Sequence, residues 1–428
     1  MFRFALALIA GLLFVSSVEA SAPMIAGHWQ GALQRGEAAT QIRLHIDASG
    51  AATLDLPDLV YAWEPVPTSH EGGRLIVQLP FGIGPMPLER EGDRLTASRG
   101  SISMVLTRTQ PPPFTRIRTM LAVDGAALPL EIFSPVSHAG LRPAIIIAAG
   151  SGTADGRMSW QTVSWCDRFV RQGFHCLAYP RRPDRDGRGG VSNLRQDAAD
   201  LASVIAFLKA RPGVDADRLG VFARSRGAWI AAEAATLTPD IRFMMLSGAA
   251  ATTPADQEII SLVERMSREG RSAAEIADAV AYERLYFYTA HTGRDWPAME
   301  AMARLAETRP WGEFVDQPLE PDDLKWWGAN GAYDPRSAYR ALRMPVFATW
   351  GGNDLVVPPE VHMPLLRELM RDNRVARFEV FPGGDHRGER PPGNGPDGTW
   401  RWFGMATGLL EAMDSWLMEN GLVAGDDG

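Results

Sequence analysis

The stretch that decides the fold runs from residue 219 to residue 228 and reads Leu-Gly-Val-Phe-Ala-Arg-Ser-Arg-Gly-Ala. An apolar run suited to a β-strand leads directly into Ser225, and a helical pattern follows at once. A serine hydroxyl is a weak nucleophile unless it projects clear of its neighbours and meets a base. Small residues two positions before and after it, here Ala223 and Gly227, let the strand and the helix pass closely. The pattern predicts a nucleophile on a strand–turn–helix elbow, with Ala223 in the place of the usual first glycine.

Two residues farther along the chain complete this predicted chemistry. Asp354 follows the apolar run 346–350, and His386 follows the run 377–381. Parallel strands present their carboxyl ends at one edge of a sheet, so both side chains are expected beside Ser225. In the order serine, acid, histidine, Asp354 would accept from the histidine Nδ1–H and leave Nε2 to take the serine proton. Taken singly, Asp354 also fits a turn residue and His386 a surface loop residue; the three together favour a catalytic triad.

Other candidate residues fit the pattern less well. His175, His291 and His362 are expected to be packed or exposed imidazoles, and Asp385 is expected to shape the loop beside His386. No His, Cys, Asp and Glu residues have the spacing of metal ligands, so we expect neither a metal nor a cofactor.

The oxyanion of an acyl-transfer reaction needs hydrogen-bond donors. The backbone N–H of Arg226, at the start of the predicted helix, is one candidate. The second is expected from the loop after the buried strand 144–148, where the chain reads Ala149-Gly150-Ser151-Gly152. We assign the second donor to Ser151, with Gly152 as the next choice.

Strands and helices alternate through residues 114–428, which predicts an α/β domain with a mostly parallel sheet and helices on both faces. The rhythm stops at about 250–343, where helices and several Trp residues are predicted instead. Inserted above the strand ends, this segment is expected to be a cap over a ligand pocket. Any one Trp in it is more simply explained by packing. The expected strands are 116–123, 128–133, 144–148, 174–179, 218–223, 243–247, 346–350 and 377–381, and the expected helices include 194–210, 227–236, 258–268, 273–288, 297–307 and 405–418.

The segment before Pro111-Pro112-Pro113 has a different texture. Short runs of alternating apolar and polar residues, such as 41–46 and 74–79, are separated by glycine-containing turns. This period of two predicts a small antiparallel β domain over residues 21–110.

The first 20 residues are expected to be a cleavable signal peptide. Arg3 supplies a positive start, residues 4–15 are apolar, and Val18-Glu19-Ala20 is a small-x-small cleavage signal. A membrane anchor is the alternative, but the apolar run is short of the roughly 20 residues that span a bilayer. We therefore expect a periplasmic or secreted protein with no stable membrane span.

The charge pattern argues against nucleic acid as a partner. The 428-residue chain carries a formal net charge of −8, and Asp184 and Asp186 interrupt its most arginine-rich stretch, 181–188. No oligomeric state is predicted.

Only two cysteines occur, Cys166 in a predicted helix and Cys176 in the strand after it. A helix lying on a sheet usually keeps the two backbones farther apart than the roughly 7 Å between Cα atoms that a disulfide tolerates. We therefore expect two buried free thiols.

From Thr119 onward the sequence resembles bacterial α/β-hydrolases of the dienelactone-hydrolase-like and acylaminoacyl-peptidase-like esterase type. The residues that carry the resemblance are Gly150-Ser151-Gly152, residues 220–227, Gly351-Gly352-Asn353-Asp354 and Gly384-Asp385-His386. Secreted members often have an N-terminal β domain. The start of that domain is similar to Gly27-His28-Trp29-Gln30-Gly31 in this chain. The resemblance implies an α/β-hydrolase fold and an acyl hydrolase. Such proteins often have histidine where this chain has Arg224.

Three functional hypotheses follow. The first is hydrolysis of a small-molecule carboxylic ester through an acyl-enzyme on Ser225, with thioesters or short peptides as further substrates. The second concerns specificity: Arg224 and Arg226 could favour anionic acyl groups, although structural ion pairing with nearby acids explains them as well. The third is a catalytically silent hydrolase-fold binding protein.

Overall fold

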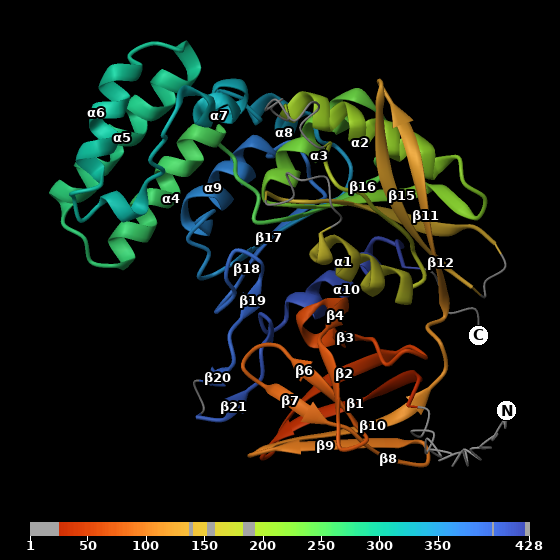
Figure 1. The fold of residues 1–428 in the computed structure, drawn as a ribbon. Helices are drawn as coiled ribbons and strands as arrows, with labels where there is room; N and C mark the ends of the chain where they lie inside the picture. The colour runs from red at the N-terminus through yellow and green to blue at the C-terminus, as the bar shows by residue number, and fades with distance from the viewer. Residues whose placement is uncertain (1–24, 137–139, 152–158, 183–192, 396–397, 424–428) are drawn as a thin grey trace, which may run out of the picture.

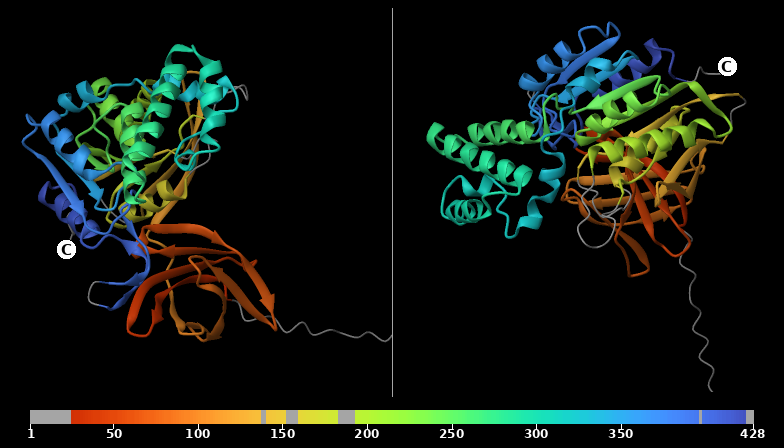
Figure 2. Two further views of the ribbon diagram at one scale, coloured as in Figure 1. Left: turned by 90° about the vertical axis from the view of Figure 1, so that its left-hand side faces the viewer. Right: turned by 90° about the horizontal axis from the view of Figure 1, so that it is seen from above.

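The computed structural model describes residues 25–136, 140–151, 159–182, 193–395 and 398–423. An N-terminal β domain lies below a central α/β domain, and a helical cap projects to one side of the α/β domain (Figures 1 and 2). This arrangement confirms the predicted fold class: an α/β-hydrolase sheet with a helical cap, preceded by an all-β domain.

The β domain is built from one large antiparallel sheet and one small one. Alternate residues of its strands point into a core that includes Trp29, Leu44 and Leu106, so the period-two pattern corresponds to one buried face. The large sheet has the order β4 (Tyr61–Val66), β3 (Ala52–Leu56), β2 (Ala38–Ile46), β1 (Gly27–Arg35), β10 (Ile102–Thr109), β9 (Arg94–Arg99), β8 (Glu89–Glu91), and the small one β5 (Thr68–Glu71), β6 (Arg74–Leu79), β7 (Gly84–Pro87).

The central sheet has eight strands, and it is parallel from β14 to β18. The hairpin β11–β12 adds the antiparallel part, with β12 pairing antiparallel to β14. Strand β13 is buried over its whole length, as expected for a continuous apolar strand covered on both faces. The strand order is β11 (Phe114–Val123), β12 (Ala126–Pro135), β14 (His175–Ala178), β13 (Arg142–Ala148), β15 (Val214–Arg224), β16 (Phe243–Ser247), β17 (Val346–Gly351), β18 (Ala376–Phe381). This is the strand order of the α/β-hydrolase fold.

Helices cover both faces of this sheet (Figure 1). On one face α2 (Leu194–Lys209), α3 (Arg226–Leu237), α8 (Arg336–Ala341) and α9 (Pro359–Leu369) pack into a single apolar cluster. On the other face α1 (Trp160–Arg171) and α10 (Leu409–Glu419) form a second cluster that is rich in aromatic side chains. The two helical layers cover the faces of the sheet, and the carboxyl ends of its strands lead into the loops.

The cap lies between β16 and α8. It contains α4 (Pro254–Arg268), α5 (Ala273–Thr292), α6 (Trp296–Ala306) and α7 (Lys325–Asn330), with the short 3₁₀ turns Gly312–Phe314 and Pro321–Leu324. The Ser272 hydroxyl and the Glu275 carboxylate form a capping box at the start of α5. Tyr282 and Trp311 pack in a core that belongs to the cap itself.

The chain between β18 and α10 differs most from the prediction. A helix was expected from Met405, but Gly404–Met405 is strand β22, paired with β19 (Glu389–Arg390), and the helix begins only after Gly408, whose φ is +83°. A second small hairpin, β20 (Gly393–Asn394) with β21 (Trp400–Arg401), lies within this segment. It carries Trp402 and Phe403 into the core of the β domain, where the Trp402 indole donates to the Ala38 carbonyl at 3.0 Å.

Helix α1 makes a second junction with the β domain. The Trp63 indole donates to Asp167 at 2.9 Å, and the Ala62 N–H donates to the Ser164 hydroxyl at 2.8 Å. Arg171 pairs with Asp167 at 2.7 Å within the helix. The Ser164 and Asp167 side chains of α1 therefore bind the β domain.

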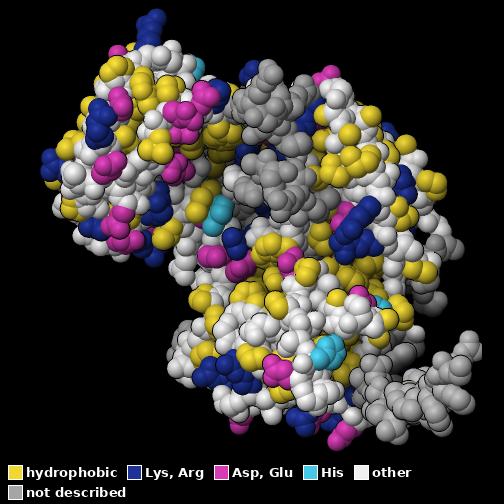
Figure 3. Space-filling view, viewed as in Figure 1, with side chains coloured by type: hydrophobic (Ala, Val, Ile, Leu, Met, Phe, Trp, Pro, Cys, Tyr) yellow, Lys and Arg dark blue, Asp and Glu magenta, His cyan; other side chains and the backbone are white. Residues whose placement is uncertain are grey.

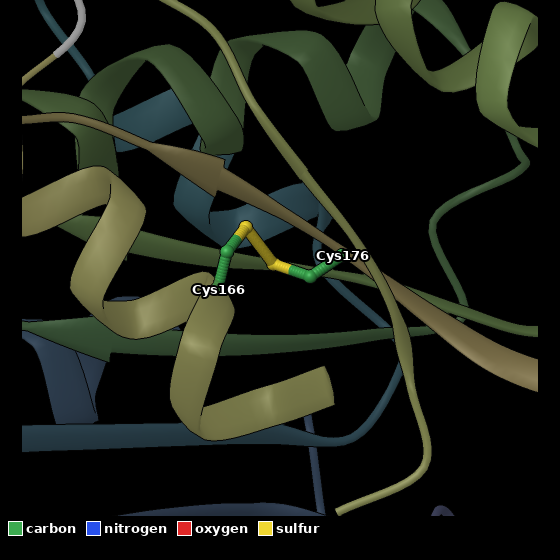
Figure 4. Close-up of a disulfide and its surroundings, with 2 residues drawn as sticks. All are labelled: Cys166 and Cys176. Carbon is green, nitrogen blue, oxygen red and sulfur yellow. A yellow bond between two sulfur atoms is a disulfide. The ribbon is translucent and has the colours of Figure 1, made fainter. Parts of the chain in front are cut away.

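The expectation of two free thiols is wrong, because Cys166 and Cys176 form a disulfide (Figure 4). Only residues 172–174 separate α1 from β14, and Gly173, with φ +89°, turns the chain back beneath the helix. The two Cα atoms are 5.2 Å apart, within the range that a disulfide needs. The usual distance between the backbones of a helix and a sheet does not apply here, because β14 begins directly after α1 ends.

The surface seen in Figure 3 mixes Lys and Arg side chains with acidic and hydrophobic ones. No helix among the described residues has both the length and the apolarity to cross a bilayer. The predicted signal peptide, residues 1–20, lies outside the described residues.

We predict that removal of the disulfide lowers stability. The bridge closes a loop with a sequence separation of 10, for which chain entropy gives about 2–3 kcal/mol. A Cys166→Ala/Cys176→Ala protein should therefore have a lower free energy of unfolding in urea, and dithiothreitol should destabilise the wild-type protein but not the variant. Two free thiols in the denatured, unreduced wild-type protein would contradict the bridge.

Candidate active site

Ser225 lies at the elbow between β15 and α3. Its backbone has φ 51° and ψ −124°, a conformation that non-glycine residues rarely adopt. The Ser225 N–H donates to the Ser247 carbonyl at 2.8 Å, which ties the elbow to the end of the adjacent strand β16. Strain of this kind persists only where the surrounding structure fixes it, and it often marks a functional residue.

Two glycines make room for the elbow. A Cβ on Gly227 would lie 2.2 Å from the Ala148 carbonyl oxygen, so the first turn of α3 crosses the end of β13 in backbone contact. A Cβ on Gly150 would lie 3.2 Å from that of Ser225. Ala223, at the other small position, is fully buried, so its methyl group is accommodated.

Asp354 and His386 form a hydrogen-bonded pair, with 2.8 Å between His386 Nδ1 and Asp354 Oδ2. The second carboxylate oxygen accepts the N–H groups of Val356 at 2.9 Å and Val357 at 2.7 Å. Asp354 is 2% exposed, and these three bonds satisfy its buried carboxylate. Ionised Asp354 can only accept, so Nδ1 carries the proton and a neutral imidazole has Nε2 as an acceptor.

Gly248, directly after β16, supports this pair. A Cβ there would lie 2.9 Å from His386 Cε1 and 3.5 Å from Asp354 Oδ2. Its φ of +61° is also one that side chains disfavour. The one sign of this glycine in the sequence is its position directly after the predicted strand 243–247.

The other histidines and Asp385 lie elsewhere. Burial lowers the pKa of His362 to about 4, and its Nδ1 accepts the Ala251 N–H at 3.2 Å. His175 contacts the Ser134 hydroxyl at 3.0 Å, and His291 is exposed on α5. The Asp385 carboxylate accepts the N–H groups of Arg387 and Glu389, so it shapes the loop as expected.

Ser225 and His386 line one cavity of about 540 Å³. The cap supplies part of its wall, as predicted for this insertion. Trp326 and Trp327 line the cavity, and Trp327 also packs against the cap core that contains Trp311, so both expected roles of the tryptophans occur. The remaining lining residues are Gly150, Ser151, Gln161, Arg181, Arg224, Arg226, Trp229, Ala250, Pro254, Gln257, Glu258, Val356, Val357 and Arg387.

The two residues predicted as oxyanion donors both line this cavity. Arg226 is the first residue of α3, and the N–H groups of a first helical turn have no acceptor inside the helix. Ser151 follows Gly150 after β13, and Gly152 lies outside the described residues. The buried Arg181 donates to the Gly150 carbonyl and so holds this loop, a role that no sequence pattern indicates.

The described part of the chain holds no group of three or more His, Cys, Asp and Glu side chains arranged to bind a metal ion. The functional groups at this site are the Ser225 hydroxyl at a strained elbow, a histidine oriented by a buried carboxylate, and backbone N–H groups in the same cavity lining. Such a set can carry out nucleophilic attack on a carbonyl group.

No protein-family profile and no curated protein matches the chain. Solved structures similar to it include DcsB in complex with its substrate analogue, at 17% identity over 73% of this chain and 100% of that one, with a TM-score of 0.45. Esterase 2 of Thermogutta terrifontis, phosphorylated by paraoxon, is 18% identical over 74% of this chain and 98% of that one, with a TM-score of 0.42. A 2,6-dihydroxy-pseudo-oxynicotine hydrolase is 15% identical over 64% of this chain, with a TM-score of 0.41, and only 63% of its length is covered.

We predict that Gly248→Ala displaces His386, because the new methyl group would lie 2.9 Å from Cε1. The downfield proton signal of the His386 Nδ1–H···Asp354 bond in ¹H NMR should shift or disappear. Gly270→Ala is the matched control, since Gly270 has φ +72° but no atom within 4 Å of the new Cβ. If both variants kept the same signal as wild type, Gly248 would not constrain the pair.

Proposed function

We propose that the protein is a serine hydrolase that cleaves carboxylic esters through an acyl-enzyme. The observation that supports this most directly is the Asp354–His386 pair, whose imidazole lines the same cavity as the strained Ser225. Each of the three side chains follows the carboxyl end of a parallel strand: β15, β17 or β18. That edge is where sheets of this kind bind ligands.

In the proposed first step, Ser225 Oγ attacks the ester carbonyl carbon while His386 Nε2 takes the hydroxyl proton. Asp354 stabilises the imidazolium that forms. The backbone N–H groups of Arg226 and Ser151 would donate to the oxyanion of the tetrahedral intermediate. Collapse of that intermediate breaks the bond to the alcohol, which leaves with the proton from His386.

In the second step, His386 deprotonates a water molecule that attacks the acyl carbon of the ester on Ser225. The acid departs, and the proton returns to Ser225 Oγ. Thioesters and short peptides would use the same steps with a different leaving group. The cavity of about 540 Å³ is of a size that suits a small-molecule substrate.

We also propose that the protein is exported after removal of residues 1–20. The Cys166–Cys176 disulfide supports this, because disulfides persist in oxidising compartments and are rare in the cytosol. We predict that full-length protein expressed in a bacterium with a periplasm is recovered there with Ser21 as its first residue. Mass spectrometry of the purified protein measures this, and recovery of Met1 in the cytosol would contradict it.

We predict that Ser225→Ala abolishes ester hydrolysis and labelling by a fluorophosphonate probe. Without the hydroxyl no acyl-enzyme can form, so kcat should fall by about 10⁶-fold, as for nucleophile removal in other serine hydrolases. Hydrolysis of 4-nitrophenyl esters with acyl chains of varied length measures activity, and in-gel fluorescence measures labelling.

Ser203→Ala is the control for this variant. Ser203 lies on α2, and its hydroxyl donates to the Ala199 carbonyl, away from the cavity. This variant should keep both activity and labelling. Full activity in Ser225→Ala would refute the proposal. A folded wild-type protein that is neither labelled nor active would fit a silent binding protein instead.

A further inference from the structure

The cavity contains polar groups that no described residue satisfies. Arg224 Nε, Trp326 Nε1 and Gln161 Nε2 are buried and have no hydrogen-bond partner among the described residues. All three residues line the cavity beside Ser225. All three atoms are donors. Because unsatisfied buried donors are costly, a cavity lined in this way favours a ligand that brings acceptors.

Arg224 is the most unusual of the three. It immediately precedes the proposed nucleophile and is only 9% exposed. Among the described residues its side chain makes one hydrogen bond, a long one of 3.3 Å from Nη2 to the Arg387 carbonyl. In the described ranges no carboxylate lies within 4.0 Å of its guanidinium. Burial lowers the pKa of Arg224 to about 10, and Glu389 and Asp385 offset this only in part, from a distance.

Arg226 provides the internal comparison. It is also buried, but it donates to Asp197 at 3.1 Å and lies over the Trp326 ring at 4.7 Å. Structural ion pairing therefore accounts for Arg226. The two arginines that flank Ser225 differ in this respect: within the described part of the chain, Arg226 has a carboxylate partner that explains its burial and Arg224 has none.

The charged side chains among the described lining of the cavity are mostly positive. Arg181 and Arg387 line the same cavity, and Asp197, a described carboxylate whose charge acts on Arg181, is also bonded to Arg226. Glu258 is the acidic residue among the lining side chains. Burial raises its pKa, and Arg265, 3.4 Å away, is its partner. The described lining of the cavity thus holds more cationic than anionic groups at neutral pH.

We propose that the substrate carries a carboxylate group in addition to the scissile ester, and that Arg224 binds this carboxylate. The planar guanidinium presents several donors to a carboxylate, and Gln161 and Trp326 offer further N–H groups to its oxygens. The ester-cleaving part of this inference rests on the proposed function. The binding part does not.

A matched pair of substrates tests the preference. Mono-4-nitrophenyl adipate carries a free carboxylate, and the 4-nitrophenyl ester of adipamic acid carries a neutral amide at the same position. The kcat/KM ratio of the anionic to the neutral ester should be at least about tenfold, in line with hydrogen bonds to charged groups. A ratio of one or less in the wild-type protein would overturn the proposal without any variant.

Arg224→Gln tests the residue. This variant should reduce the ratio of the two kcat/KM values to near one, whatever happens to the absolute rates, because it removes the charge but keeps an amide donor. Arg304→Gln is the control, since Arg304 pairs with Glu300 on α6 and lies outside the cavity, yet the change in net charge is the same. A ratio that survives in Arg224→Gln would show that Arg224 does not bind the carboxylate.

Binding to an inactive protein separates this proposal from the proposed function. In calorimetry, Ser225→Ala protein should bind monomethyl adipate more tightly than methyl adipamate, and Ser225→Ala/Arg224→Gln should not distinguish them. If wild type hydrolyses neither ester but this difference holds, the esterase proposal fails and the anion site stands. If wild type cleaves both esters equally and the difference is missing, the esterase proposal stands and the anion site fails.

Discussion

The candidate site depends on the buried carboxylate of Asp354. A charge so far from solvent is tolerated only if its oxygens are bonded, and here two backbone N–H groups and the His386 ring bond them. Those bonds set the relative positions of the loops after β17 and β18. The backbone reinforces them, because a Cβ on Gly351 would lie 2.2 Å from the Asp385 carbonyl oxygen. The hydrogen bond to Asp354 and the backbone contact at Gly351 thus fix the orientation of the His386 ring, as a site that orients a proton acceptor requires.

Much of the fold was predictable because its signals are local. The apolar runs that became β13, β15 and β17 are continuous, and such runs fit strands that helices cover on both faces. The elbow was visible for the same reason, since a strand, Ser225 and a helix are adjacent in the sequence. The shared direction of the parallel strands then predicted that Asp354 and His386 would lie at the same edge of the sheet as Ser225.

The features that sequence reasoning missed arise between segments that are distant in the chain or from the geometry of a turn. Cys166 and Cys176 approach each other because Gly173 reverses the chain within three residues, which no periodicity encodes. Arg181 reaches the Gly150 carbonyl across 31 positions of sequence. Trp402 was assigned to no element, and its partner Ala38 is 364 positions away. Contacts of this kind depend on tertiary packing.

The attachment of Trp402 and Phe403 to the β domain has a consequence for how the molecule can be divided. The segment that carries these rings begins at β19, three residues after His386. It ends at α10, the helix that packs on the central sheet. A fragment beginning at residue 114 would expose both rings to water and release the loop next to the imidazole. The N-terminal domain therefore cannot be exchanged or removed as a separate module. When the protein is engineered, the β-domain surface that contacts Trp402 and Phe403 must be changed together with the loop that carries His386.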